Sequence, residues 1–146
     1  MIRSFGFATV FKSQFSLRRE YPIMIRIKRA YDEVSEDDGY RVLVGRLWPR
    51  GVTKERAAIA LWLKDVAPST ELREWFGHDP KKWGEFRERY WKELDDRQKD
   101  VELIMNKARE GTVTLVYSAR DREHNTAVAL KQYIESQGKI SIRPMH

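Results

Sequence analysis

Hydrophobic residues in this chain follow two periods, one typical of strands and one typical of helices. Apolar and basic residues alternate from Met24 to Arg29, as in a strand with one buried face. Apolar runs rich in β-branched and aromatic residues cover 40–47, 59–63 and 112–117. These four segments are predicted strands, and 112–117 is the clearest of them.

Three later segments have the helical period. Apolar side chains recur every three or four residues in 83–94, 101–108 and 127–134, which places them along one face of each helix. Glycines follow two of these segments, and we expect Gly111 and Gly138 to end the helices there.

Helix starts have their own signals. Ser69 or Thr70 can cap a short helix, because either side chain can accept a hydrogen bond from a free backbone N–H of the first turn. Asp79 followed by Pro80 combines a cap with a residue suited to the first helical position. The last elements therefore alternate as helix, strand and helix.

This alternation predicts the fold class. We expect one three-layer α/β domain, with a mostly parallel sheet of about four strands flanked by helices on both faces. In such folds ligands gather beyond the carboxyl ends of the strands.

The pattern changes abruptly at Met24. Residues 1–23 have no clean period, and they hold four basic residues against one acidic residue, a net charge of +3 out of +6 for the chain. We expect an extension or disordered tail over 1–23 and a single domain over 24–146. An added structural element and a targeting segment stay open as alternatives, although the extension lacks a long apolar stretch with a small-residue cleavage site.

Composition narrows the class of protein. Charged residues make up 34% of the chain, and no apolar stretch is long enough for a membrane-spanning helix, so no membrane partner is expected. The chain has no cysteine, which excludes disulfides and thiol nucleophiles and favours a cytoplasmic location. His78, His124 and His146 lie far apart without metal-ligand spacing, so no metal site is expected. No cofactor and no oligomeric state follow from the sequence.

Three motifs together carry a family resemblance. They are the segment from Val44 to Gly51 (VGRLWPRG), Trp75 to Pro80 (WFGHDP) with Trp83, and Tyr117 to Asp121 (YSARD) with His124 and Asn125. The region from Met24 to Glu135 resembles the YeaO-like branch of a superfamily of domains of unknown function. That resemblance implies a compact bacterial or archaeal α/β domain and no established activity.

The chain also departs from the wider superfamily that it resembles. Many members of that group carry Cys near position 117 and Cys-His-Arg near 125–127. Here those positions are Tyr117, Asn125, Thr126 and Ala127. The resemblance therefore gives no support to thiol- or metal-dependent chemistry in this chain.

The first candidate binding segment follows the strand predicted at 40–47. Arg46 and Arg50 flank Trp48-Pro49, and two guanidinium groups beside one tight turn suit a phosphate or carboxylate. Arg46, Trp48 and Arg50 are therefore candidate ligand-binding residues. The alternative is structural: Arg46 pairs with an acidic neighbour, and Trp48 packs beneath a rigid turn.

The second candidate segment joins the strand at 112–117 to the closing helix. His124 could act as a general acid or base, with Ser118 and Asp121 beside it as further catalytic candidates. Arg120 and Asn125 could bind a ligand near the positive end of the helix. The alternative is that Ser118 and Asp121, at Ser-x-x-Asp spacing, cap the helix.

Aromatic side chains give a third set of candidates. Trp75 and His78 could stack on a ring, and the hydroxyl of Tyr117 could reach the same sheet edge as Arg46. Packing in the core is the competing explanation, because aromatic residues at helical spacing usually fill a core.

Three functions remain open. The first is a small enzyme or a binding protein for an anionic metabolite or nucleotide, in which Arg46, Arg50 and Arg120 converge on one anion at the carboxyl edge of the sheet. The second is a nucleic-acid-associated module, for which no sequence signature is found. The third is a regulatory or interaction domain without chemistry.

The extension yields the first testable prediction. A chain starting at Met24 should unfold cooperatively near the melting temperature of the full-length protein, because residues 1–23 lack an apolar periodic face. Thermal unfolding followed by circular dichroism measures both chains. Aggregation of the shorter chain, or a melting temperature several degrees lower, would show that the extension belongs to the fold.

Overall fold

The computed structural model of the protein describes residues 23–142, and the side chains as far as Gln137. The extension predicted over 1–23, except for its last residue, lies outside the described residues, and so does His146. Among the described helices, none is long and apolar enough to cross a membrane.

The sheet has four parallel strands, in the order β1-β4-β2-β3. They are β1 (Ile25–Arg29), β2 (Tyr40–Leu43), β3 (Leu61–Trp62) and β4 (Val113–Tyr117). Every residue of β4 is buried, because β4 pairs with β1 on one side and with β2 on the other. The predicted fold class, a single α/β domain built on a mostly parallel sheet, is confirmed.

Long helices cover one face of the sheet. Ile25, Val42 and Leu115 point to this face and belong to one core with apolar residues of α4, α5 and α6. The α-helices are α2 (Lys54–Ala57), α3 (Thr70–Phe76), α4 (Trp83–Leu94), α5 (Gln98–Glu110) and α6 (Thr126–Ile142).

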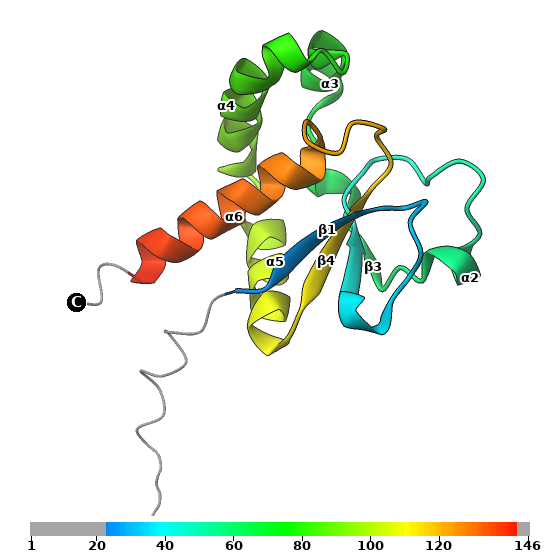
Figure 1. Ribbon diagram of the computed structural model, residues 1–146. Coiled ribbons are helices and arrows are strands. Elements are labelled where there is room, and N and C mark those ends of the chain that lie inside the picture. Colours follow the sequence, from blue (N-terminus) through cyan, green and yellow to red (C-terminus); the bar gives the residue numbers. More distant parts are fainter. Residues whose placement is uncertain (1–22, 143–146) are drawn as a thin grey trace, which may run out of the picture.

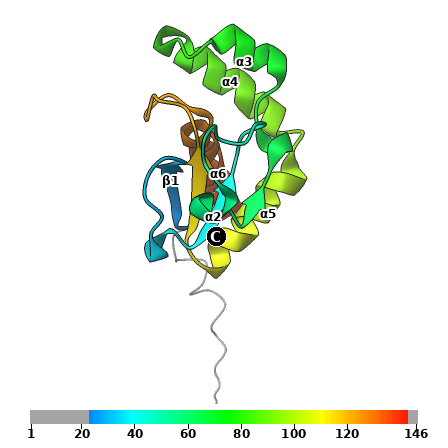
Figure 2. The same ribbon diagram turned by 90° about the vertical axis from the view of Figure 1, so that its right-hand side faces the viewer.

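The opposite face has a thinner cover. Figure 2 shows α2 on one side of the sheet and α6 on the other. Leu43 and Val116 pack there against the half-buried rings of Trp48 and Trp62, which belong to the β2–β3 region. The third layer of the domain thus consists of chain connections and one short helix.

The predicted helical stripes are confirmed. Phe86, Tyr90 and Leu94 of α4 are almost fully buried, and so are the apolar positions of the stripe in α5. Ser69 caps α3 by accepting a hydrogen bond from the Leu72 N–H. Asp79 accepts one from the Lys81 N–H at the 3-10 turn that leads into α4.

Two predicted boundaries were wrong. The second strand ends at Leu43 instead of position 47, because pairing with β4 stops where β4 ends and the chain turns away after Val44. The closing helix α6 continues through Gly138 to Ile142. A glycine inside a helix costs only about 1 kcal/mol relative to alanine, which the rest of a long helix can offset.

A buried ion cluster holds β1, β2 and the turn between them together. The Asp38 carboxylate accepts hydrogen bonds from Lys28 Nζ (2.9 Å), Arg41 Nη1 (2.7 Å) and the Ser35 N–H (3.1 Å). Burial raises the pKa of Asp38, but the hydrogen bonds from Lys28, Ser35 and Arg41 outweigh it and hold the pKa below its ordinary value. The side chains of Asp38 and Arg41 are 1% and 3% exposed.

The turn that carries Asp38 continues into Gly39, where there is no room for a side chain. Its φ is 64°, and a Cβ atom there would lie 2.2 Å from the Thr112 carbonyl oxygen, just before β4. Gly39 therefore lets this turn pass directly against the start of the central strand.

The ion cluster yields a prediction about stability. Asp38→Ala should lower the free energy of unfolding by about 3–5 kcal/mol, because it leaves the buried Arg41 charge without its partner. Chemical denaturation measures the loss. Asp37→Ala is the matched control, because the Asp37 side chain is exposed and its substitution should cost less than about 0.5 kcal/mol. Equal effects of the two substitutions would contradict the assigned role of Asp38.

Candidate functional site

A pocket of about 420 Å³ lies beyond the carboxyl ends of β2 and β4. After β2 the chain crosses toward β3 over one face of the sheet, and after β4 it enters α6 on the other face. Adjacent strands whose connections leave on opposite faces create a crevice, which is the usual ligand position in open parallel sheets. Figure 1 shows α3 and α4 above the sheet, on the side where the loop after β4 emerges.

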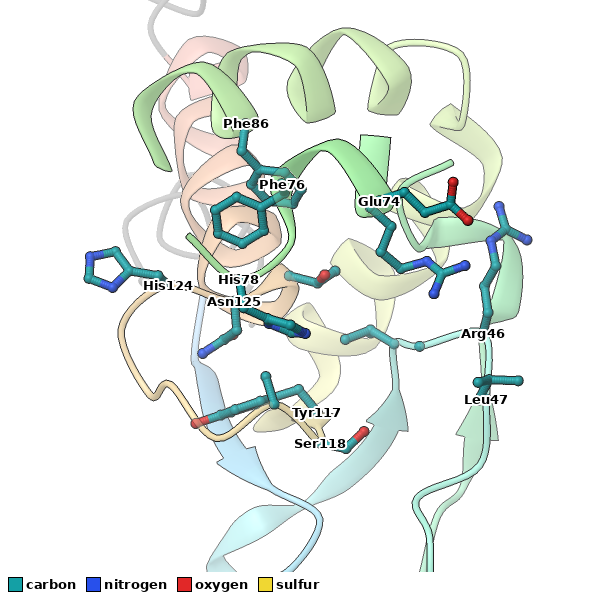
Figure 3. A pocket seen from close by; sticks show the side chains of 15 residues that line it. Arg46, Leu47, Glu74, Phe76, His78, Phe86, Tyr117, Ser118, His124 and Asn125 are labelled. Carbon is teal, nitrogen blue, oxygen red and sulfur yellow. The ribbon is translucent and has the colours of Figure 1, made fainter. Parts of the chain in front are cut away.

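Four parts of the chain line this pocket, and Figure 3 shows their side chains. They are the segment after β2, helix α3 with the residues after it, one position of α4, and the region from the end of β4 to the start of α6. The lining residues are Val44, Gly45, Arg46, Leu47, Arg73, Glu74, Phe76, His78, Phe86, Tyr117, Ser118, Ala119, His124, Asn125 and Thr126.

Aromatic rings form the inner wall of the pocket. Phe76 and Phe86 stack with ring centroids 4.3 Å apart, and the two side chains are 5% and 1% exposed. Tyr117 is equally buried, and burial raises the pKa of its hydroxyl. These rings are fixed by the core, so the wall is apolar and rigid.

Charged side chains line another part of the pocket. Arg46 is half-buried, donates to the Pro68 carbonyl oxygen (3.4 Å) and lies 3.9 Å from the exposed carboxylate of Asp65. Arg73 and Glu74 of α3 are exposed, and neither makes an ion pair or a side-chain hydrogen bond within the described part of the chain. Among residues 23–137, the Arg73 guanidinium therefore has no hydrogen-bond or ion-pair partner.

His124 is held by Asp121. The Asp121 carboxylate lies 2.9 Å from His124 Nδ1 and accepts the N–H groups of Glu123 and His124. The hydrogen bond from the Glu123 N–H, followed by that from the His124 ring, lowers the pKa of Asp121. The His124 ring also contacts Trp83 edge-on at 5.3 Å.

The Asp121–His124 pair is not positioned to activate the Ser118 hydroxyl as a nucleophile. Figure 3 shows the His124 ring directed away from Phe76 and His78, while the Ser118 hydroxyl points in a different direction. No hydrogen bond between Ser118 and His124 occurs among residues 23–137. The three catalytic candidates thus lie on one loop without the relay that activates a serine.

Asn125 is the residue that caps α6. Its Oδ1 accepts the Val128 N–H (3.0 Å), and its Nδ2 donates to the Asp121 carbonyl oxygen (2.9 Å). The alternative in which Ser118 and Asp121 cap this helix is therefore wrong, because the helix begins at Thr126 and Asp121 closes the preceding turn instead. Asn125 is 3% exposed, and both polar atoms of its amide are used in these structural hydrogen bonds.

Two contacts from the β1 side fix the loop that follows β4. Arg29 donates to the carbonyl oxygens of Ala119 (2.8 Å) and Ser118 (3.3 Å). Arg122 forms two hydrogen bonds of 2.9 Å with the Asp32 carboxylate. The Arg122 bond is the largest influence lowering the pKa of Asp32 to about 2, so this contribution to stability is present above about pH 4 and is lost toward pH 2.

The other candidates from the sequence lie outside the pocket. Trp48 donates to the Val52 carbonyl oxygen (2.6 Å) and packs edge-on against Trp62, as the structural alternative expected. Arg50 and Arg120 are exposed and are not among the residues that line the pocket. The structure therefore brings Arg46, but neither Arg50 nor Arg120, to the pocket.

Of the aromatic candidates, His78 lines the pocket and Trp75 does not. His78 has a φ of 58°, directly after Gly77 in the same left-handed region. This conformation is uncommon for a residue with a side chain, and it turns the chain back after α3. Trp75 packs against the core, with Arg89 4.4 Å and Lys82 5.0 Å from its ring centroid.

Sequence reasoning missed Arg73 and Glu74. They occupy consecutive positions of a short helix, and no spacing in the sequence relates them to the sheet. The one sequence feature that points to this region is the motif from Trp75 to Pro80, which contains their neighbours Phe76 and His78. The placement of α3 over the sheet edge, a long-range packing effect, makes them pocket residues.

Within residues 23–142, no group of three or more histidine, cysteine, aspartate or glutamate side chains is arranged to hold a metal ion. The polar side chains that line the pocket carry guanidinium, imidazole, hydroxyl and amide groups and one carboxylate, that of Glu74.

Comparisons with known proteins agree on one family. Residues 24–141 match a sequence model described as the inactive DUF488-N3 subclade. An uncharacterized protein of Mycobacterium tuberculosis (strain ATCC 25618 / H37Rv) is 41% identical over 113 residues, which are 77% of this chain and 95% of the relative. The uncharacterized protein YeaO of Escherichia coli (strain K12) is 39% identical over 112 residues, 77% of this chain and 97% of the relative. No solved structure matches the chain significantly.

The capping arrangement yields a prediction. Asn125→Ala should lower the free energy of unfolding by about 1–2 kcal/mol, because the Val128 N–H loses its acceptor. Ser118→Ala should change it by less than about 0.5 kcal/mol, since the Ser118 side chain is exposed and does not cap the helix. Urea denaturation of both variants tests the assignment, and a larger loss in Ser118→Ala would reverse it.

Proposed function

Because this chain belongs to the inactive DUF488-N3 subclade, we propose that its pocket binds a small carboxylated or phosphorylated ligand without converting it. The resemblance to the YeaO-like family is confirmed by the matched model and by the relative YeaO. Family membership identifies no ligand. The chemical class of the proposed ligand is therefore argued from the residues of the pocket.

The observation that carries the proposal is an unpaired guanidinium in a pocket at the carboxyl edge of the sheet. Arg73 lines the pocket and has no acidic partner among the described residues, while Arg46 lines it from a different segment. A guanidinium offers planar, paired N–H donors that match a carboxylate or phosphate. Two such groups beside an apolar wall favour a small organic anion.

Several features favour binding over catalysis. The chain has no cysteine, and among residues 23–137 no basic side chain is hydrogen-bonded to the Ser118 hydroxyl. Tyr117 and Asn125 lie near the positions at which many members of the wider superfamily that the chain resembles carry Cys, and both line the pocket. Burial raises the pKa of the Tyr117 hydroxyl, which therefore stays protonated near neutral pH and is a poor nucleophile.

A small ligand is also favoured over nucleic acid. A base-stacking site requires an open aromatic face, and Trp75 has both Arg89 and Lys82 within 5.0 Å of its ring centroid. The other large aromatic rings at the pocket, Phe76 and Phe86, are buried. The aromatic residues near the pocket therefore offer no platform for a nucleic-acid strand.

Substitution of Arg73 tests the proposal. Arg73→Gln should weaken binding of inorganic phosphate or succinate roughly tenfold, because a charged hydrogen-bond donor is lost. Isothermal titration calorimetry measures the affinity, and the melting temperature without ligand should stay unchanged because Arg73 is exposed.

The matched control is Arg56→Gln on α2. Arg56 is an exposed arginine outside the pocket, so this variant has the same change in net charge and should bind both anions like the wild type. Equal weakening in both variants would mean that only general charge attracts the anions. Absence of anion binding by the wild-type protein at millimolar concentrations would refute the proposed function.

A further inference from the structure

Glu74 places a negative charge at a pocket whose other charged side chains are arginines. It is exposed, lines the pocket, and has no cationic partner within 4.0 Å among the described residues. In Figure 3 its carboxylate lies on the same side of the pocket as the Arg46 guanidinium. The charged region of the pocket therefore combines donors from Arg46 and Arg73 with an acceptor from Glu74.

A carboxylate in this position disfavours a bare anion. Like charges a few ångströms apart repel, and the repulsion is weakened but not removed by water at an open site. A hydrogen-bond donor or a positive group on the ligand would turn this repulsion into attraction. The arrangement thus discriminates between ligands that share an anionic group but differ in what is attached to it.

The size of the pocket independently favours an organic ligand over a bare inorganic anion. Its volume of about 420 Å³ lies within the range of about 300–1,000 Å³ typical of pockets for organic ligands. A phosphate ion has few atoms, so most of this space would remain filled with water. The apolar wall of Phe76, Phe86 and Tyr117 has no counterpart on a bare anion either.

We propose that the ligand carries a hydrogen-bond donor close to its anionic group, either sugar-type hydroxyls or an ammonium group, and that Glu74 accepts from this donor while Arg73 and Arg46 bind the anion. This inference rests on the proposed function of the pocket and adds the chemical class of its ligand. Sugar phosphates, including the sugar-phosphate part of nucleotides, and amino acids have this combination of groups. Glu74 is then a residue that determines specificity.

Two pairs of probes isolate the donor. Glycerol 3-phosphate and propyl phosphate differ only in two sugar-type hydroxyls, whereas phenylalanine and 3-phenylpropanoate differ only in the ammonium group. Calorimetric titration of the wild-type protein should show that the donor-bearing member of at least one pair binds roughly tenfold more tightly than its partner. The pair that discriminates identifies the donor as hydroxyl or ammonium.

Glu74→Gln then tests the residue. This variant should bind the preferred donor-bearing probe roughly tenfold more weakly, and the donor-free anion of the same pair about two- to threefold more tightly, because the repulsion is removed. Glu71→Gln is the matched control, since Glu71 is exposed on the same helix and does not line the pocket. Its affinities should equal those of the wild type, and all three proteins should share one melting temperature.

The outcomes separate the two proposals. If the wild-type protein binds no anion, or if binding does not depend on Arg73, the proposed function fails. If anions bind through Arg73 but neither probe pair discriminates, or if Glu74→Gln weakens no donor-bearing probe, the inference about Glu74 is wrong while the proposed function stands. Opposite shifts for the two members of one pair in Glu74→Gln support it, because a purely structural role of Glu74 would move both in the same direction.

Discussion

The parallel pairing of β4 with both β1 and β2 is the interaction on which the rest of the structure depends. A strand buried on both faces must satisfy its backbone N–H and C=O groups within the sheet, and β4 can do so only between two neighbours. The last strand of the chain is therefore inserted between the first two. Gly39 and the Asp38 cluster hold the β1–β2 turn against the start of this strand, which keeps all three strands in register.

The insertion of β4 also produces the pocket. The connection from β2 to β3 crosses one face of the sheet, while the chain after β4 enters α6 on the other face. A crevice therefore opens beyond the carboxyl ends of β2 and β4. Helix α3 then closes one side of this space, where Arg73 and Glu74 supply two of the charged groups and Phe76 part of the apolar wall. The contacts of Arg29 and Arg122 keep the opposite loop in place.

Membership of an inactive subclade is consistent with the proposal that the pocket binds a ligand without converting it. Tyr117 and Asn125 occupy pocket positions, but a buried phenol and a capping amide serve packing and helix formation. The Asp121–His124 pair is held by hydrogen bonds, and His124 lines the pocket. In the proposed function, the charged side chains of Arg46, Arg73 and Glu74 bind and select the ligand through hydrogen bonds and charge, without covalent chemistry.

The sequence by itself determined what depends on near neighbours in the chain: four strands, the buried stripes of α4 and α5, the caps at Ser69 and Asp79, and a parallel α/β class. These features follow from hydrophobic period and from local hydrogen bonds, both of which act over a few residues. It also identified Arg46, His78, Tyr117 and His124, because they flank strands or belong to motifs. Only the tertiary structure decided the strand order, the exclusion of Arg50 and Arg120 from the pocket, and the recruitment of Arg73 and Glu74. Those outcomes depend on packing between segments far apart in the chain, which no local pattern encodes.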